Sequence, residues 1–99
     1  MRHFLIELTY TAPLARMDEV APDHGAYLQP AYASGRLLYS GRQVPPTGGL
    51  ILARFESREA LDAFLAEDPY NKAGVAEYRV IEFSPTRFQP FMQAWSEGA

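Results

Sequence analysis

Apolar and polar side chains alternate along the first ten residues of the chain. One face of this segment carries Phe4, Ile6, Leu8 and Tyr10. The other face is mixed, with His3, Leu5, Glu7 and Thr9. A period of two is typical of a strand with one buried face. The pattern therefore predicts a strand from Arg2 to Tyr10 whose second face is only partly polar.

Two later stretches have the apolar spacing of helices. The first is expected from about Pro22 to Ser34, because proline suits a first helical turn and Gly35 is a natural stop. Residues 14–21 are expected to form a short helical or irregular lead-in. The second helix is expected over Arg58–Glu67, with Ser57 as its N-cap.

Three further strands and a tail complete the pattern. Arg36–Gly41 is a short strand, followed by a loop rich in proline and glycine that ends at Gly49. Leu50–Phe55 is the most continuously apolar strand and is expected at the centre of the sheet. Tyr78–Phe83 is the last strand, and Pro90–Trp95 is expected to form a short amphipathic helix in the C-terminal tail.

The order of these elements predicts an α+β fold of the ferredoxin-like βαββαβ type, with a four-stranded antiparallel sheet in a single domain over residues 1–99. Right-handed crossovers place both helices on one face and make them antiparallel. The other face would then be an open apolar patch, which a monomer rarely exposes. We therefore expect a homodimer that pairs two sheets face to face.

Two acids at the end of the second helix depart from the usual local pattern. Glu67 and Asp68 lie where the helix macrodipole disfavours negative charge. Such local inconsistencies tend to mark function or strain. Substitution of Asp68 by alanine is accordingly expected to cost activity or ligand binding more than stability. The alternative is that Asp68 is a solvated turn residue holding the backbone beyond Pro69.

The predicted topology brings His24 close to Asp68, because the start of one helix lies beside the end of the other. His24 shares the inward face of its helix with Tyr27 and Leu28. A histidine held by a carboxylate is a common acid/base unit, since the carboxylate fixes the imidazole tautomer and stabilises the charged ring. The alternative is a histidine that only packs at the helix start.

Composition excludes several classes of function. The formal net charge is −3 with acids and bases mixed, which argues against the clustered basic surface of a nucleic-acid-binding protein. Without cysteine the chain has no disulfide, thiolate ligand or thiol nucleophile, and with two histidines a metal site is not expected. No segment reads as a signal peptide or membrane span, so a cytoplasmic protein is expected.

The sequence resembles the YciI-like (YCII-related) family of the dimeric α+β barrel class. The resemblance covers most of the chain up to Phe83 and does not include the tail beyond Ser84. It is carried, in order, by Phe4–Tyr10, His24 with Tyr27–Leu28, Ala33–Gly41, Gly48–Gly49, Glu67–Tyr70, Ala73–Gly74 and Tyr78–Phe83.

The resemblance implies a His–Asp pair in a pocket, here His24 and Asp68. It also implies pocket roles for Ser40 and Gly41, which end the second strand, and for Tyr70, the aromatic residue after Asp-Pro. Related chemistry is lyase- or isomerase-like proton transfer on small, often aromatic or lactone-type molecules. The expected function is therefore a cofactor-free acid/base enzyme acting on a small organic substrate. The alternative is a non-catalytic small-ligand-binding or interaction domain that uses the same pocket.

Overall fold

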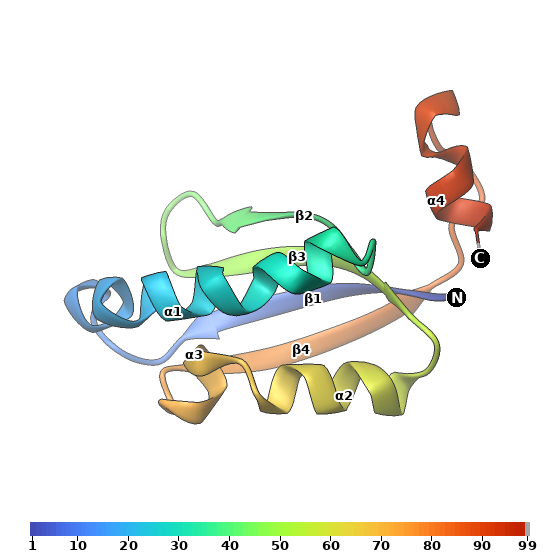
Figure 1. Ribbon diagram of the computed structural model, residues 1–99. Coiled ribbons are helices and arrows are strands. Elements are labelled where there is room, and N and C mark those ends of the chain that lie inside the picture. The colour runs from blue at the N-terminus through green and yellow to red at the C-terminus, as the bar shows by residue number, and fades with distance from the viewer. Residues whose placement is uncertain (99) are drawn as a thin grey trace.

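The computed structural model describes residues 1–98 of the chain. Its elements follow the expected ferredoxin-like order, with one additional short helix before the last strand (Figure 1). They are β1 (Arg2–Tyr10), α1 (Leu14–Ala33), β2 (Leu37–Arg42), β3 (Gly48–Phe55), α2 (Arg58–Ala66), α3 (Pro69–Lys72), β4 (Ala76–Phe83), the 3₁₀ turn η1 (Pro90–Met92) and α4 (Gln93–Glu97). None of these helices is long and apolar enough to span a bilayer.

The sheet is antiparallel with strand order β2-β3-β1-β4, which confirms the predicted four-stranded topology and the central place of β3. The helices α1 and α2 lie on one side of the sheet and run in opposite directions (Figure 1). This arrangement brings α3, which follows the end of α2, alongside the first half of α1. The connection between α2 and β4 is therefore available to complete a site with α1.

The core lies between the sheet and the two helices. Phe4, Ile6 and Leu8 are the inward residues of β1 and are completely or almost completely buried. They alternate with residues of the opposite face, as the period-two pattern predicts. Most of the remaining core side chains come from β3, α1 and α2 and include Ile51, Ala53, Phe55, Met17, Leu28, Ala31, Leu61 and Leu65, and the others are Leu37, Tyr70, Val75 and Ala76.

The prediction that the first helix starts near Pro22 was wrong, because α1 begins at Leu14 and continues through both Pro22 and Pro30. An interior proline removes one backbone hydrogen bond and is normally unfavourable in a helix. Here Met17 and Val20 extend the buried face of the helix by more than a turn before Pro22. Burial of these side chains offsets the local cost, so tertiary packing overrides the proline signal.

The start of the third strand also differs from the prediction, since β3 begins at Gly48 rather than at Leu50. Glycine is depleted in strands, which explains the error. A side chain cannot be accommodated here, because a Cβ at Gly48 would lie 1.8 Å from the carbonyl oxygen of Leu8. Gly48 therefore allows β3 to pair closely with β1 along its full length.

The C-terminal tail is helical, as predicted, and α4 lies beyond the end of the sheet, near the start of β1 (Figure 1). The guanidinium of Arg54 lies 4.3 Å from the ring centroid of Trp95 and donates to the Trp95 carbonyl at 3.1 Å. His3, which alternation places on the open face of the sheet, is buried rather than exposed. Burial lowers the pKa of His3, and a hydrogen bond with the backbone of Ser96 in the tail acts in the opposite direction.

Candidate active site

Asp68 lies in the short connection between α2 and α3, and its side chain is completely buried. It is the N-cap of α3, because its Oδ1 accepts the backbone N–H of Tyr70 at 3.1 Å. An acid is favoured at a helix N-terminus, by capping and by the macrodipole. The expectation of a carboxylate at an unfavourable helix end is thus corrected: the acid belongs to the start of the next helix.

Asp68 also holds His24 of α1. The Nδ1–H of His24 donates to Oδ1 of Asp68 at 2.7 Å, and the Tyr78 hydroxyl donates to Oδ2 at 2.7 Å. Because a carboxylate only accepts, this geometry fixes the imidazole proton on Nδ1. Burial and the neighbouring Asp68 raise the pKa of Tyr78, so its hydroxyl remains a donor at neutral pH.

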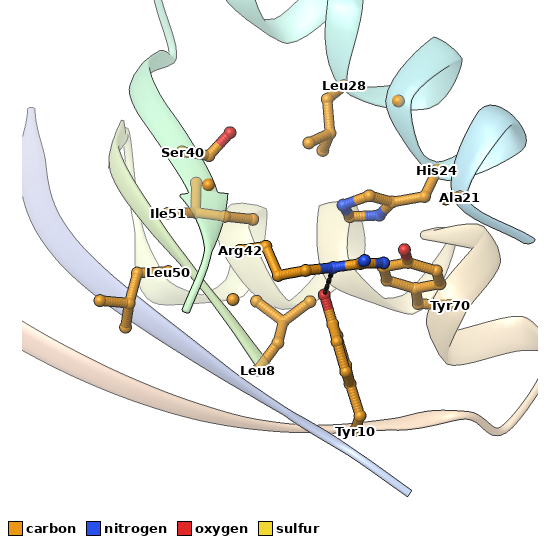
Figure 2. A pocket seen from close by; sticks show the side chains of 13 residues that line it. Leu8, Tyr10, Ala21, His24, Leu28, Ser40, Arg42, Leu50, Ile51 and Tyr70 are labelled. Atoms are coloured by element: carbon orange, nitrogen blue, oxygen red, sulfur yellow. Dashed lines mark hydrogen bonds between the residues drawn. The ribbon is translucent and has the colours of Figure 1, made fainter. Parts of the chain in front are cut away.

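The imidazole ring of His24 is held by stacking as well as by this hydrogen bond. The rings of His24 and Tyr70 are nearly parallel, with centroids 4.0 Å apart and an interplanar angle of 13°. The side chain of His24 is 16% exposed. Its second ring nitrogen, Nε2, points into the neighbouring cavity (Figure 2). The ring therefore has a fixed orientation with one nitrogen available to a ligand.

The cavity has a volume of about 300 Å³ and lies on the helix side of the sheet, between α1, β2 and the start of α3. All of the predicted pocket residues except Asp68 line it, namely His24, Ser40, Gly41 and Tyr70. Asp68 lies behind His24 and is joined to it by the hydrogen bond to Nδ1. The remaining lining residues are Leu8, Tyr10, Ala21, Gly25, Leu28, Arg42, Gly49, Leu50 and Ile51.

The hydroxyl of Ser40 already has a hydrogen-bond partner in the protein. Its hydroxyl forms a short hydrogen bond with the Tyr32 hydroxyl of α1, and either oxygen can be the donor. Gly41 presents only backbone to the cavity. These two residues shape the β2 side of the site, while His24 and Tyr70 form the opposite side (Figure 2).

Sequence reasoning missed three polar residues of the site, Tyr10, Arg42 and Tyr78. Arg42 directs its Nε–H to the Tyr10 hydroxyl at 3.2 Å and its Nη2 to Asp18 of α1 at 2.9 Å. Alternation along β2 places Arg42 on the same face as Ser40, which is a signal that could have identified it. Tyr78 could have been found in the same way, since it pairs with the buried Leu8.

No group of three histidine or acidic side chains with metal-binding geometry occurs within residues 1–98. Both oxygens of Asp68 are already engaged by protein donors. The polar groups that a ligand in the cavity can meet are therefore the imidazole of His24, the hydroxyls of Tyr10, Ser40 and Tyr70, and the guanidinium of Arg42.

The fold and the site define a small ferredoxin-like α+β domain with a histidine–aspartate pair beside a pocket on the helix side of its sheet. A sequence model of the YCII-related domain matches residues 1–84, and the chain belongs to this family. The resemblance seen in the sequence is thereby confirmed. The tail, including η1 and α4, lies outside the matched residues.

Curated relatives and a solved structure agree with this assignment. The chain is 39% identical over 69 residues to Protein YciI of Escherichia coli O6:H1 (strain CFT073) and of Shigella flexneri, covering 60% of this chain and 70% of each relative. A similar fold occurs in 5-chloro-2-hydroxyhydroquinone dehydrochlorinase from Burkholderia phenoliruptrix AC1100, solved in complex with 2,5-dihydroxybenzoquinone. The TM-score is 0.70 at 23% identity, covering 88% of this chain and 93% of the other.

Proposed function

We propose that this protein is a cofactor-free acid/base enzyme that catalyses a lyase- or isomerase-like proton transfer on a small organic molecule. The observation that carries the proposal is the hydrogen bond from His24 Nδ1–H to the buried Asp68, which leaves Nε2 directed into a cavity of about 300 Å³. His24 is the proposed base and Asp68 the residue that positions it.

The proposed reaction begins with neutral His24, whose lone pair on Nε2 accepts a proton from the substrate. The C–H or O–H bond of the substrate breaks, and its electron pair stays on the substrate as an enolate or phenolate. Asp68 stabilises the imidazolium that results, because the carboxylate lies 2.7 Å from Nδ1. An isomerase would return the proton to another atom, whereas a lyase would expel a leaving group.

The size of the cavity and the activity of the structural relative support a ring-shaped substrate. A cavity of about 150 Å³ is enough to bind benzene, so the larger space here can hold a substituted six-membered ring. The dehydrochlorinase of similar fold removes hydrogen chloride from a hydroxylated aromatic ring, as its name states. We therefore propose hydroxylated or halogenated aromatic compounds and unsaturated lactones as the first substrates to examine.

The proposal is tested with a panel of chlorinated hydroquinones, hydroxyquinones and unsaturated lactones incubated with the protein in D₂O. At least one compound is expected to lose halide, isomerise or incorporate deuterium faster than without protein, as followed by proton NMR. Compounds that bind without any of these changes would instead support the alternative, a non-catalytic small-ligand-binding or interaction domain.

We also propose that the protein is a homodimer formed by the open faces of two sheets. This face exposes Tyr39, Leu50, Ile81 and Phe83, and neither α1 nor α2 covers it (Figure 1). The same face carries Glu7 opposite Arg79, so it has both charge signs and can be complementary to itself under two-fold symmetry. A second copy of the chain is therefore the proposed occupant. The single-domain organisation and the cytoplasmic location expected from the sequence stay predictions.

Light scattering tests the dimer. At micromolar concentration the protein is expected to have twice the chain mass of 11.1 kDa. Replacement of Ile81 by lysine, on the edge strand β4 of this face, should shift the mass toward that of one chain, because a buried charge opposes association. Replacement of Val44 by lysine is the matched control. Val44 is exposed in the loop between β2 and β3, so this variant should keep the mass of the wild type. A wild-type protein of single-chain mass would contradict the proposal.

A further inference from the structure

Arg42 is the charged residue that borders the cavity and has no role yet in the proposed reaction. It ends the edge strand β2 and pairs with Gly49, on the helix side of the sheet. Its side chain is 39% exposed and extends across the cavity below His24 toward Tyr70 (Figure 2). The guanidinium carbon lies 5.5 Å from the ring centroid of Tyr10, so the aromatic face also holds it in place.

The hydrogen bonds of Arg42 leave part of its donor capacity unused. A guanidinium has five N–H groups. Within residues 1–98, hydrogen bonds to Tyr10 and Asp18 account for the Nε–H and for one donor of Nη2. The side chain of Asp18 is 62% exposed, so water screens this ion pair and weakens its hold on the charge. Arg42 can therefore donate to a ligand while it remains anchored.

The residues that line the cavity carry positive charge, whereas the whole chain is negatively charged. The protein has a formal net charge of −3, yet no aspartate or glutamate is among the residues that line the cavity. Burial raises the pKa of the Tyr70 hydroxyl, and the nearby Arg42 acts in the opposite direction because it favours the phenolate. An oxygen anion in this part of the cavity would be stabilised in the same way.

We propose that the cavity is selective for a small planar organic anion, whose negatively charged oxygen is bound by Arg42 and whose reacting atom lies at Nε2 of His24. This inference rests on the proposed function, since it assigns the substrate class for the same site. In the proton transfer, the electron pair of the broken C–H bond stays on the substrate, which changes from a monoanion to a dianion, and the added charge is delocalised over the conjugated system that carries the oxygen bound by Arg42. The guanidinium thus stabilises the charge that develops as His24 takes the proton.

Benzoate and benzamide provide a direct test, because they have nearly the same shape and differ in charge. Neither compound needs to react, so binding is measured by NMR titration independently of turnover. The wild-type protein is expected to bind benzoate about tenfold or more tightly than benzamide, the range for a hydrogen bond to a charged group. Arg42→Gln should reduce this preference to within about threefold, and Arg42→Lys should restore part of it.

Two further variants separate Arg42 from general charge effects. Arg36→Gln is the matched control, because Arg36 is similarly exposed, also pairs with an acid, Glu56, and does not line the cavity. It should keep the preference for benzoate. Asp18→Asn should increase benzoate affinity by about threefold, the size of a surface ion pair, because it removes the competing carboxylate.

A wild-type protein that binds the two compounds equally, or an Arg42→Gln variant that keeps the full preference, would overturn this inference. Neither result depends on turnover in the substrate panel, so a protein that transforms a compound of the panel would still support the proposed function. Conversely, a preference for benzoate that depends on Arg42, in a protein that transforms nothing in the panel, would support anion binding and count against the enzyme.

Discussion

Substitution of Asp68 by alanine is expected to lower the free energy of unfolding by about 3 kcal/mol or more, the range for disrupting a buried polar network. The side chain is completely buried and accepts hydrogen bonds from His24, Tyr78 and the backbone N–H of Tyr70. Alanine leaves these donors without an acceptor, and an unsatisfied buried polar group is costly. It also removes the N-cap of α3.

Urea denaturation of the wild type and the variant measures this loss. Asp62→Ala is the matched control, since Asp62 is an exposed acid on α2 that pairs with Arg58. It should change the unfolding free energy by no more than about 0.5 kcal/mol. A loss below about 1 kcal/mol for Asp68→Ala would mean that the hydrogen bonds around the carboxylate contribute little to folding.

Replacement of His24 by glutamine is expected to lower the rate of proton transfer by about 100-fold or more, the usual contribution of a positioned general base. Glutamine can still hydrogen-bond to Asp68, but its amide is not basic enough to accept a proton. The effect should appear in kcat for the compound that the panel identifies.

His3→Gln provides the control for this substitution. His3 is the other histidine of the chain, is buried beside the tail, and is not among the residues that line the cavity. Its replacement should leave kcat within about twofold, since it touches no reacting group. A His24→Gln variant with nearly wild-type kcat would contradict the assignment of His24 as the base.

The fold could be predicted from the sequence because its periodic patterns are strong. The alternation in β1, the apolar run of β3 and the N-cap Ser57 of α2 mark elements that the structure contains. The start of α1 could not be predicted, because Pro22 is a local signal whereas burial of Met17 depends on the whole fold. Gly48 was misplaced for a similar reason, since its closeness to Leu8 exists only once the strands pair.

The candidate site was predicted only in part. His24 and Asp68 were named because the topology brings their elements together, and a hydrogen bond of 2.7 Å joins them. Asp68 was expected at the end of α2, whereas it is the N-cap of α3, a helix that the sequence pattern did not indicate. The expectation that alanine at position 68 costs function more than stability is revised to a loss in both, because the side chain of Asp68 is buried and caps α3. Arg42 and Tyr78 were missed because their roles depend on contacts between distant segments.

The orientation of the imidazole is the feature on which the proposed chemistry depends. The hydrogen bond to Asp68 requires the proton of neutral His24 on Nδ1, so that Nε2 is unprotonated and faces the cavity. The Oδ1 that accepts this hydrogen bond also accepts the backbone N–H of Tyr70 at 3.1 Å, so an Asp68→Asn variant keeps its amide oxygen at this position and His24 keeps its proton on Nδ1, while the negative charge behind the ring is lost.

A long-range proton–nitrogen NMR correlation spectrum of the imidazoles, recorded where His24 is neutral, tests this account most directly. The wild-type spectrum should show a protonated Nδ1 and an unprotonated Nε2 for His24, and Asp68→Asn should keep this pattern, because its amide oxygen can accept from both Nδ1 and the Tyr70 N–H. His3, which Asp68 does not contact, serves as the internal reference and should give the same pattern in both proteins. A wild-type His24 protonated on Nε2 would contradict the assignment of the His24–Asp68 pair as the acid/base unit.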